Sequence, residues 1–216
     1  MTFSYFTEGV AEYVMTLFPT DFKGVCIDVG AFDPLWISNS WIFERAGWDV
    51  YCIEPNPHCL PKLRAMRQNV IDFACGAESA DDVDFYIYKT DWAGPNEKAE
   101  TVWKGNAADT GLIRHEKTNG NIDDIVKVKV RTLDYIIGHY NLPIDHIDFL
   151  SIDVEKNEMS VLRGLSLWIW TPKVIAIENE FKTEDQHGWL ASYGYVCINR
   201  IGVNDIYMKA VGMLKQ

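Results

Sequence analysis

Acidic and amide side chains follow almost every short apolar stretch of this chain, and their types suit the binding of a small ligand. Asp28, Gly30 and Asp33 lie in the stretch VCIDVGAFDP, residues 25–34. The comparable positions further along the chain are Glu54, Asn56, Asp72, Asp153, Glu155, Glu178 and Asn179. If the apolar stretches are parallel strands, these residues meet at the edge where open α/β sheets bind ligands. One acid at such an edge is more often a helix cap, but acids at nearly every strand end indicate a binding site.

A nicotinamide dinucleotide is the first ligand to test against this pattern. Glu54 follows Gly30 at close to the roughly 20 residues expected of a ribose-binding acid. A pyrophosphate, however, needs a close backbone approach at the second glycine of a G-x-G-x-x-G motif. Here Gly30 is followed by the sequence AFDP, which places a bulky ring and a negative charge in that path. The pattern therefore argues against an NAD-dependent dehydrogenase.

S-adenosylmethionine suits the same positions better, because it has no phosphate and carries a sulfonium and an ammonium group. Acids near Asp28 and Asp33 would attract these cations, and Glu54 would accept both ribose hydroxyls. The end of the third predicted strand would flank the adenine with Asp72, Phe73 and Ala74. Acid-rich strand ends also occur in phosphatase-like folds that hold magnesium, so a metal stays open as an alternative.

Apolar periodicity predicts the elements that carry these residues. Strands alternate with helices early in the chain, which is typical of an α/β domain with a parallel sheet, and the last two strands are antiparallel. Residues 1–20 are predicted to hold an amphipathic helix that packs on the sheet or on a second subunit, so a homodimer is one expected state. Residues 82–89 and 125–132 alternate as strands of an inserted hairpin, and residues 89–122 form a long loop or lid. No linker divides the chain, so a single domain over residues 1–216 is expected.

Three blocks of the sequence carry a resemblance to a known family. They read CIDVGAFDPLWISNSWIFERAGWDVYCIEPNP, RTLDYII and IDFLSIDVEKNEMSVLRGL, and together they extend from about Gly24 to Leu165. These blocks resemble the FkbM-like S-adenosylmethionine-dependent methyltransferases, whose members commonly read I-D-V-E-G-x-E where this chain has Lys156 in place of the glycine. The resemblance implies a Rossmann-like class I methyltransferase fold with a seven-stranded, mostly parallel sheet that has one antiparallel strand. It also implies O-methylation of a sugar or another small hydroxylated molecule, with Asp28, Gly30, Glu54 and Asn56 as cofactor contacts.

The acceptor hydroxyl must lose its proton during methyl transfer, and two arrangements compete for that step. In the first, Asp153 or Glu155 takes the proton directly, with His115 in the long loop as an alternative base. In the second, Asp153, Glu178 and Asn179 hold magnesium or calcium, a set similar to that of the catechol-type O-methyltransferases. Against the metal, Glu178 and Asn179 are the kind of residues that cap the next helix or bind loop amides.

Composition limits the partners and the compartment. The formal net charge is −11, and scattered Lys and Arg residues exclude a general affinity for nucleic acid or an anionic membrane. Apolar runs fall short of the roughly 20 residues of a membrane span, and the N-terminus has no basic start, so a cytoplasmic location is expected. The five cysteines form no C-x-x-C pair and are predicted to be buried apolar groups. A protein that binds S-adenosylmethionine without catalysis is the non-enzymatic alternative.

Overall fold

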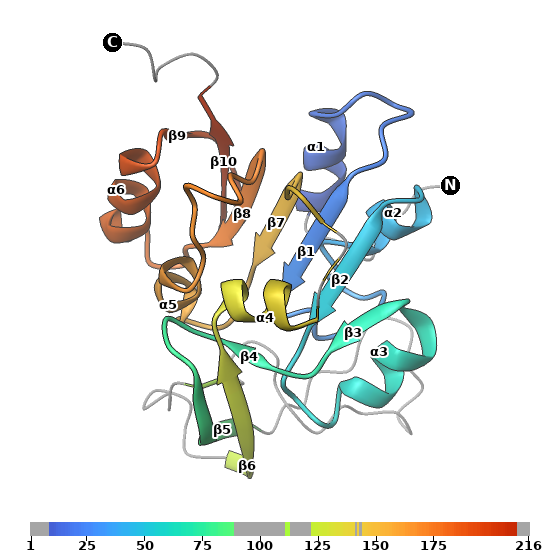
Figure 1. Cartoon of the computed structure of the whole chain (residues 1–216), viewed down its shortest axis with the longest axis vertical. Helices are drawn as coiled ribbons and strands as arrows, with labels where there is room; N and C mark the ends of the chain where they lie inside the picture. The colour runs from blue at the N-terminus through green and yellow to red at the C-terminus, as the bar shows by residue number, and fades with distance from the viewer. Residues whose placement is uncertain (1–8, 89–110, 113–121, 141, 143, 211–216) are drawn as a thin grey trace.

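The computed structural model describes residues 9–88, 111–112, 122–140, 142 and 144–210 (Figure 1). Its centre is a seven-stranded sheet in the order β3-β2-β1-β7-β8-β10-β9. The strands are β1 (Val25–Val29), β2 (Asp49–Ile53), β3 (Asn69–Ile71), β7 (Phe149–Ile152), β8 (Val174–Glu178), β9 (Tyr195–Ile201) and β10 (Asn204–Lys209). The pairs from β3 to β8 are parallel, whereas β10 pairs antiparallel with both β8 and β9. A mixed α/β fold with a mostly parallel sheet is therefore confirmed.

Helices cover both faces of this sheet, because its central strands are apolar on both sides. The helices are α1 (Val10–Thr16), α2 (Trp41–Arg45), α3 (Leu60–Met66), α4 (Leu133–His139), α5 (Glu158–Arg163) and α6 (Glu184–Ser192). Buried side chains of α1, α2 and α3 pack into one core on one face. Those of α4, α5 and α6 pack into a second core on the opposite face. The sheet is thus the middle of three layers, as in other Rossmann-like folds.

The alternation of side chains along β1 decides what its acid can contact. Val25, Ile27 and Val29 face the helices α4 to α6, and Cys26 faces α1 to α3. Asp28 shares the face of Cys26, because side chains along a strand alternate with a period of two. Its carboxylate consequently points toward α2 and α3.

The segment NVIDFAC was predicted as a single third strand, and this prediction is wrong. Its first part forms β3, which pairs with β2 in the main sheet, whereas β4 (Ala74–Cys75) pairs with β6 in a second sheet. The chain changes partner at Asp72 and Phe73. Polar Asp72 is half exposed on its way out of the main sheet, which ends the apolar strand there.

The second sheet has the order β4-β6-β5, and its long strands β5 (Ala80–Tyr88) and β6 (Ile122–Arg131) pair antiparallel as an inserted hairpin (Figure 1). Its small core contains Ala74, Phe85, Ile87, Val128 and Val130. Most of the predicted lid, residues 89–122, lies outside the described residues. Gly111 is described, and it forms an isolated antiparallel bridge with Tyr86.

The first predicted helix is described from Val10 onward, where Val10, Ala11 and Val14 are fully buried against the sheet. All five cysteines are free, and four of them are buried. Burial raises the pKa of the Cys52 thiol to about 12, which fits the predicted role as a buried apolar group. In the described part of the chain, none of the helices has the length and apolar character needed to cross a bilayer.

Candidate active site

A cavity with about 840 Å³ of empty space, open to solvent, lies at the carboxyl ends of β1, β2 and β7. The small sheet and the loop between β1 and α2 complete its wall. Eight of the residues predicted for the site line this cavity: Asp28, Gly30, Glu54, Asn56, Phe73, Ala74, Asp153 and Glu155. Asp33, Asp72, Glu178 and Asn179 are not part of the wall that the described residues form, and His115 lies outside the described residues.

Glu54 follows β2 directly, and its carboxylate is held in one orientation by the backbone around it. Oε1 accepts a hydrogen bond from the Asn56 amide at 2.8 Å, and Oε2 accepts one from the Phe32 amide at 2.9 Å. Each oxygen has two lone pairs, so each can still accept a hydroxyl from a ligand. Burial raises the pKa of Glu54 to about 7, although the two amide hydrogen bonds act in the opposite direction.

Gly30 ends β1 with a left-handed backbone, φ +87°. A Cβ atom at this position would lie 1.7 Å from the carbonyl oxygen of Asp153, which is far inside contact distance. The glycine thus lets the chain after β7 pass directly beside β1. Gly30 therefore packs against the backbone of Asp153 and also lines the cavity.

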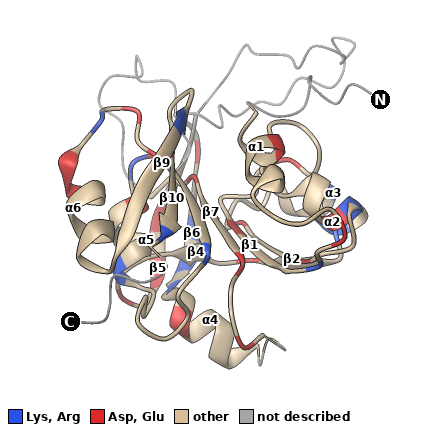
Figure 2. Ribbon diagram, turned by 90° about the horizontal axis from the view of Figure 1, so that it is seen from above, with Lys and Arg blue, Asp and Glu red and all other residues tan. Residues whose placement is uncertain are grey.

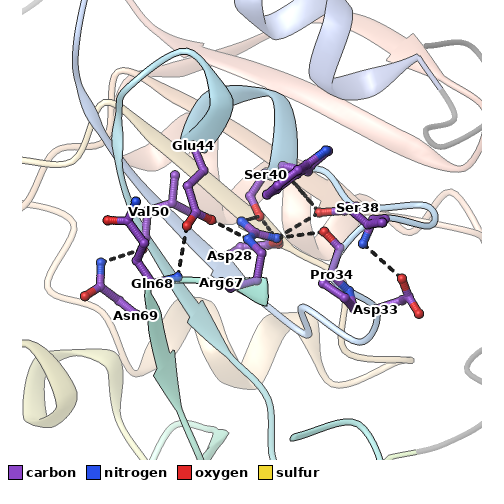
Figure 3. Close-up of polar contacts among 12 residues, drawn as sticks. Asp28, Asp33, Pro34, Ser38, Ser40, Glu44, Val50, Arg67, Gln68 and Asn69 are labelled. Atoms are coloured by element: carbon purple, nitrogen blue, oxygen red, sulfur yellow. Dashed lines mark hydrogen bonds and ion pairs between the residues drawn. The ribbon is translucent and has the colours of Figure 1, made fainter. Parts of the chain in front are cut away.

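Asp28 belongs to a buried polar network that Figure 3 shows around Arg67. The Asp28 carboxylate accepts a hydrogen bond from the Ser40 hydroxyl, and the same hydroxyl accepts one from the Arg67 guanidinium at 2.8 Å. On its other side, Arg67 pairs with Glu44. Burial raises the pKa of Asp28, and the hydroxyl and the guanidinium lower it again. Asp28 therefore joins the cavity wall to α2 and to the residue that follows α3.

Asp33 and Asp72, two predicted cofactor contacts, have other partners. Asp33 Oδ1 accepts the amides of Leu35 and Trp36, both at 2.9 Å, while Oδ2 pairs with Lys62 at 2.5 Å. Asp72 pairs with Arg64 at 3.0 Å on the surface. Asp33 thus stabilises the turn in which it lies, and Asp72 forms an ion pair with α3.

The turn after β7 brings two predicted catalytic acids to the cavity. Asp153 and Glu155 both line it, and Glu155 and Lys156 have positive φ angles of 57° and 76°. Such angles strain residues other than glycine by about 1–2 kcal/mol each. A glycine at position 156 would adopt this conformation without strain, which gives a physical reason for the family's I-D-V-E-G-x-E pattern.

A comparison with protein-family models bears on this arrangement. The model described as the methyltransferase FkbM domain matches residues 28–197, which include the end of β1 and all of β2, β7 and β8. The chain belongs to the FkbM methyltransferase family. No curated protein and no solved structure matches the chain.

In this FkbM domain, the end of β8 offers little to a metal ion. The amide of Asn179 donates to Asp205 at 2.7 Å, and its oxygen accepts the Thr183 amide at 2.8 Å. The side chain of Asn179 therefore links the loop before α6 to β10, and both of its ends have protein partners. Across the described residues, no group of three or more His, Cys, Asp or Glu side chains is arranged to hold a metal.

Glu178 lies next to other carboxylates, which changes its protonation. Burial, together with the charges of Asp153 and Glu158, raises its pKa to about 9. Glu158 in turn has a raised pKa because it is buried, and it shares a side-chain hydrogen bond with Glu178. Near neutral pH Glu178 therefore holds a proton.

Sequence reasoning missed two parts of the wall of the FkbM cavity. The loop between β1 and α2 contributes Trp36, Ile37, Ser38 and Asn39, and the inserted hairpin contributes Phe85 and Leu112. The polar run SNS, residues 38–40, directly before α2 has the composition of a helix cap. Its position directly after the strand that carries Asp28 is the signal that could have placed it at the site.

Proposed function

We propose that this protein transfers a methyl group from S-adenosylmethionine to an oxygen of a small hydroxylated acceptor, such as a sugar or a secondary metabolite. The observation that carries the proposal is Glu54. It is a buried carboxylate at the end of β2, fixed by two backbone amides, with one lone pair on each oxygen left for a neighbouring pair of hydroxyls. Membership of a methyltransferase family makes the ribose diol of S-adenosylmethionine the natural partner.

The wall of the cavity fits the other parts of this cofactor. Phe73 and Ala74 offer apolar surface for an adenine at the point where the chain leaves the main sheet. Asp28, Asp153 and Glu155 make the wall acidic, which favours a ligand that carries sulfonium and ammonium cations. When bound, the cofactor would supply an electrophilic methyl group that needs no further activation.

The residues of the chain would then position the acceptor and remove its proton. Asp153 and Glu155 are the acids at the wall beside β7, and either can accept a proton from a hydroxyl within hydrogen-bond reach. Trp36, Phe85 and Leu112 provide an apolar side on which the ring of an acceptor can stack. His115 stays an alternative base that lies outside the described residues.

Two other functions were considered, and neither has a specific observation in its favour. A metal-dependent reaction would need Asn179 to release both partners of its amide. Binding of S-adenosylmethionine without catalysis would use Asp153 and Glu155 only to attract the cofactor, and no observation favours that restriction.

Calorimetry with S-adenosylhomocysteine tests the cofactor. We expect binding to the wild type, no binding of NAD, and a loss of about 10- to 100-fold in Glu54→Ala, because charged hydrogen bonds to the diol are lost. Asp72→Ala is the matched control, since Asp72 also follows a strand but pairs with Arg64 at the surface. Equal binding of NAD, or equal losses in the two variants, would contradict the proposal.

Transfer of a labelled methyl group to a panel of neutral sugars and phenols tests the chemistry. Asp153→Asn keeps the size of the side chain but removes the base, so we expect turnover to fall by about 100-fold or more while S-adenosylhomocysteine still binds. Full activity in this variant would leave Glu155 or His115 as the base. Unchanged activity after dialysis against a chelator is expected.

The setting of this reaction is part of the proposal. Five free cysteines suit a reducing compartment such as the cytoplasm. A net charge of −11 disfavours nucleic acid and anionic membranes as partners, and Figure 2 shows Lys and Arg residues spread over several elements. A homodimer is a separate expectation that sedimentation would test.

A further inference from the structure

The turn between β7 and α5 has a backbone conformation that its sequence does not favour. Glu155 and Lys156 are consecutive non-glycine residues with positive φ angles. Isolated L-residues rarely adopt this conformation, so the surrounding structure must hold it. The question is which group does so, because this turn carries the acids at the cavity wall.

Glu158, the first residue of α5, reaches back to this turn. Its Oε1 accepts the backbone amide of Lys156 at 2.9 Å and that of Val154 at 3.3 Å. These two amides lie on either side of Glu155, so a single carboxylate oxygen closes the turn around that residue. Glu158 is 5% exposed, and its hydrogen bonds are therefore shielded from water.

Glu158 is itself held from the other side by Glu178, with which it shares a side-chain hydrogen bond. Two carboxylates cannot bond to each other unless one carries a proton. Burial raises the pKa of Glu178 to about 9, so Glu178 is the donor and Glu158 remains the acceptor. An ionised carboxylate that accepts two amides and one hydroxyl is well satisfied despite its burial.

Gly30 fits the closed turn into the cavity wall, because a Cβ at this position would overlap the carbonyl oxygen of Asp153. Gly111 lies on the other side of the turn, where a Cβ would be in ordinary contact, 3.5 Å from the carbonyl oxygen of Val154. The Asp153 amide also donates to the Val29 carbonyl at 3.0 Å. The start of the turn is thus fixed against the end of β1, and the conformation of the turn determines where the side chains of Asp153 and Glu155 lie.

We propose that Glu158 is a positioning residue, whose carboxylate holds the turn of residues 153–157 in the left-handed conformation that places Asp153 and Glu155 at the cavity wall. It acts through the backbone and touches neither cofactor nor acceptor. The expected effect on ligand binding rests on the proposed function. The hydrogen bonds that close the turn can be measured without a ligand.

Amide hydrogen exchange measures the closing of the turn directly. In the wild type, the amides of Val154 and Lys156 should be protected, because a buried carboxylate accepts both. Glu158→Ala should expose them, whereas Glu158→Gln should keep them protected, since its amide oxygen can accept the same two hydrogen bonds. Unprotected amides in the wild type, or equal protection in the alanine variant, would overturn the proposal.

Calorimetry with S-adenosylhomocysteine measures the consequence for the cavity. We expect Glu158→Ala to bind about tenfold more weakly, because the wall is no longer preorganised, and Glu158→Gln to bind like the wild type. Glu184→Ala is the matched control, because Glu184 is the first residue of α6, as Glu158 is of α5. Its substitution removes an acid from the N-terminus of a helix but leaves the turn of residues 153–157 unchanged. Equal losses in the glutamine and alanine variants would show that the charge matters rather than the turn, and would overturn the inference.

A double variant covers the case in which Glu158→Ala folds poorly. Lys156→Gly should restore part of the affinity to Glu158→Ala, because glycine adopts a positive φ without strain. No restoration by glycine in a folded double variant would contradict the role of the turn. Failure of the wild type to bind S-adenosylhomocysteine would overturn the proposed function, and the exchange of the two amides would still decide the role of Glu158.

Discussion

Single atoms decide the shape of this site, and Gly30 is the clearest case. In many ligand-binding loops a glycine lets a ligand approach the backbone. Here the nearest atom to its missing side chain is the carbonyl oxygen of Asp153, which belongs to the protein itself. The glycine is required because two chain segments pack directly against each other at this point. This contact also places Asp153 at the cavity wall.

Gly30→Ala tests this role. A Cβ would overlap backbone that cannot rotate away, and the φ of +87° would be strained as well, so we expect a loss of about 3 kcal/mol or more in the free energy of unfolding. Urea denaturation followed by circular dichroism measures the change.

Gly188→Ala provides the matched control. Gly188 lies inside α6, and no atom lies within 4 Å of the Cβ that the substitution adds. Alanine favours a helix over glycine by about 0.5–1 kcal/mol, so this variant should be slightly more stable. Similar effects of the two substitutions would show that the contact between Gly30 and Asp153 is not formed.

At the scale of elements, Arg67 joins three segments that the sequence places far apart. Its guanidinium contacts Glu44 of α2 and donates to Ser38 and Ser40 of the loop that lines the cavity (Figure 3). It also lies 5.6 Å from the centre of the Trp41 ring. The side chain is fully buried, so its charge is compensated only by the groups that it touches.

Arg67→Met removes the cation and keeps most of the volume. Glu44 and Asp28 would then be carboxylates without a cation beside them, and breaking a buried pair in this way costs about 3–5 kcal/mol. Arg45→Met is the control, because Arg45 stacks on the same Trp41 ring but is exposed. Thermal unfolding should show a large loss for the first variant and little change for the second. A loss of less than about 1 kcal/mol for Arg67→Met would mean that the network is dispensable.

Much of the arrangement of elements follows from the sequence, and the exceptions have physical causes. Apolar runs followed by acids located β1, β2, β7 and β8, because a buried parallel strand has a clear composition. The same apolar pattern wrongly predicted β3 and β4 as one strand, because periodicity shows where strands are but not which strands pair.

The candidate site divides in a similar way. Glu54 could be predicted because the end of β2 is a fixed place in this type of sheet. The preference of Asp33 for its own turn could not, because a carboxylate that accepts nearby amides looks the same in sequence as one that faces a ligand. The role of Glu158 depends on the shape of a turn, which no periodicity encodes.

At the scale of the whole molecule, buried acids link stability to pH. Burial raises the pKa of Glu178 to about 9 and that of Glu54 to about 7, and it also raises the pKa values of Asp28 and Glu158. The unfolded chain releases these protons near pH 4, so between about pH 4.5 and 9 the folded protein holds more protons than the unfolded one. Stability must therefore fall as the pH rises through this range.

Thermal unfolding from pH 5.5 to 8.5 measures this effect. We expect the midpoint temperature to fall as the pH rises. The underlying loss in the free energy of unfolding is at most about 1.4 kcal/mol per pH unit for each group. Repulsion from the net charge of −11 acts in the same direction. Glu178→Gln separates the two causes, because it keeps a neutral hydrogen-bonding group and should flatten the dependence, whereas Glu78→Gln at an exposed position should not. A midpoint that rises with pH would contradict the assignment of protons to these acids.

The exit of the chain from the main sheet at Asp72 and Phe73 also bears on how such a protein can diverge. Gly30 and Glu54 directly follow strands of the main sheet, whereas Phe85 comes from the inserted hairpin. The two halves of the cavity are thus encoded in separate stretches of the gene, joined through β4. Mutations in β5 or β6 can remodel the side proposed to face an acceptor without changing the residues proposed to hold the methyl donor. Under the proposed function, the hairpin is therefore the place where selection, or a designer, would exchange one acceptor for another.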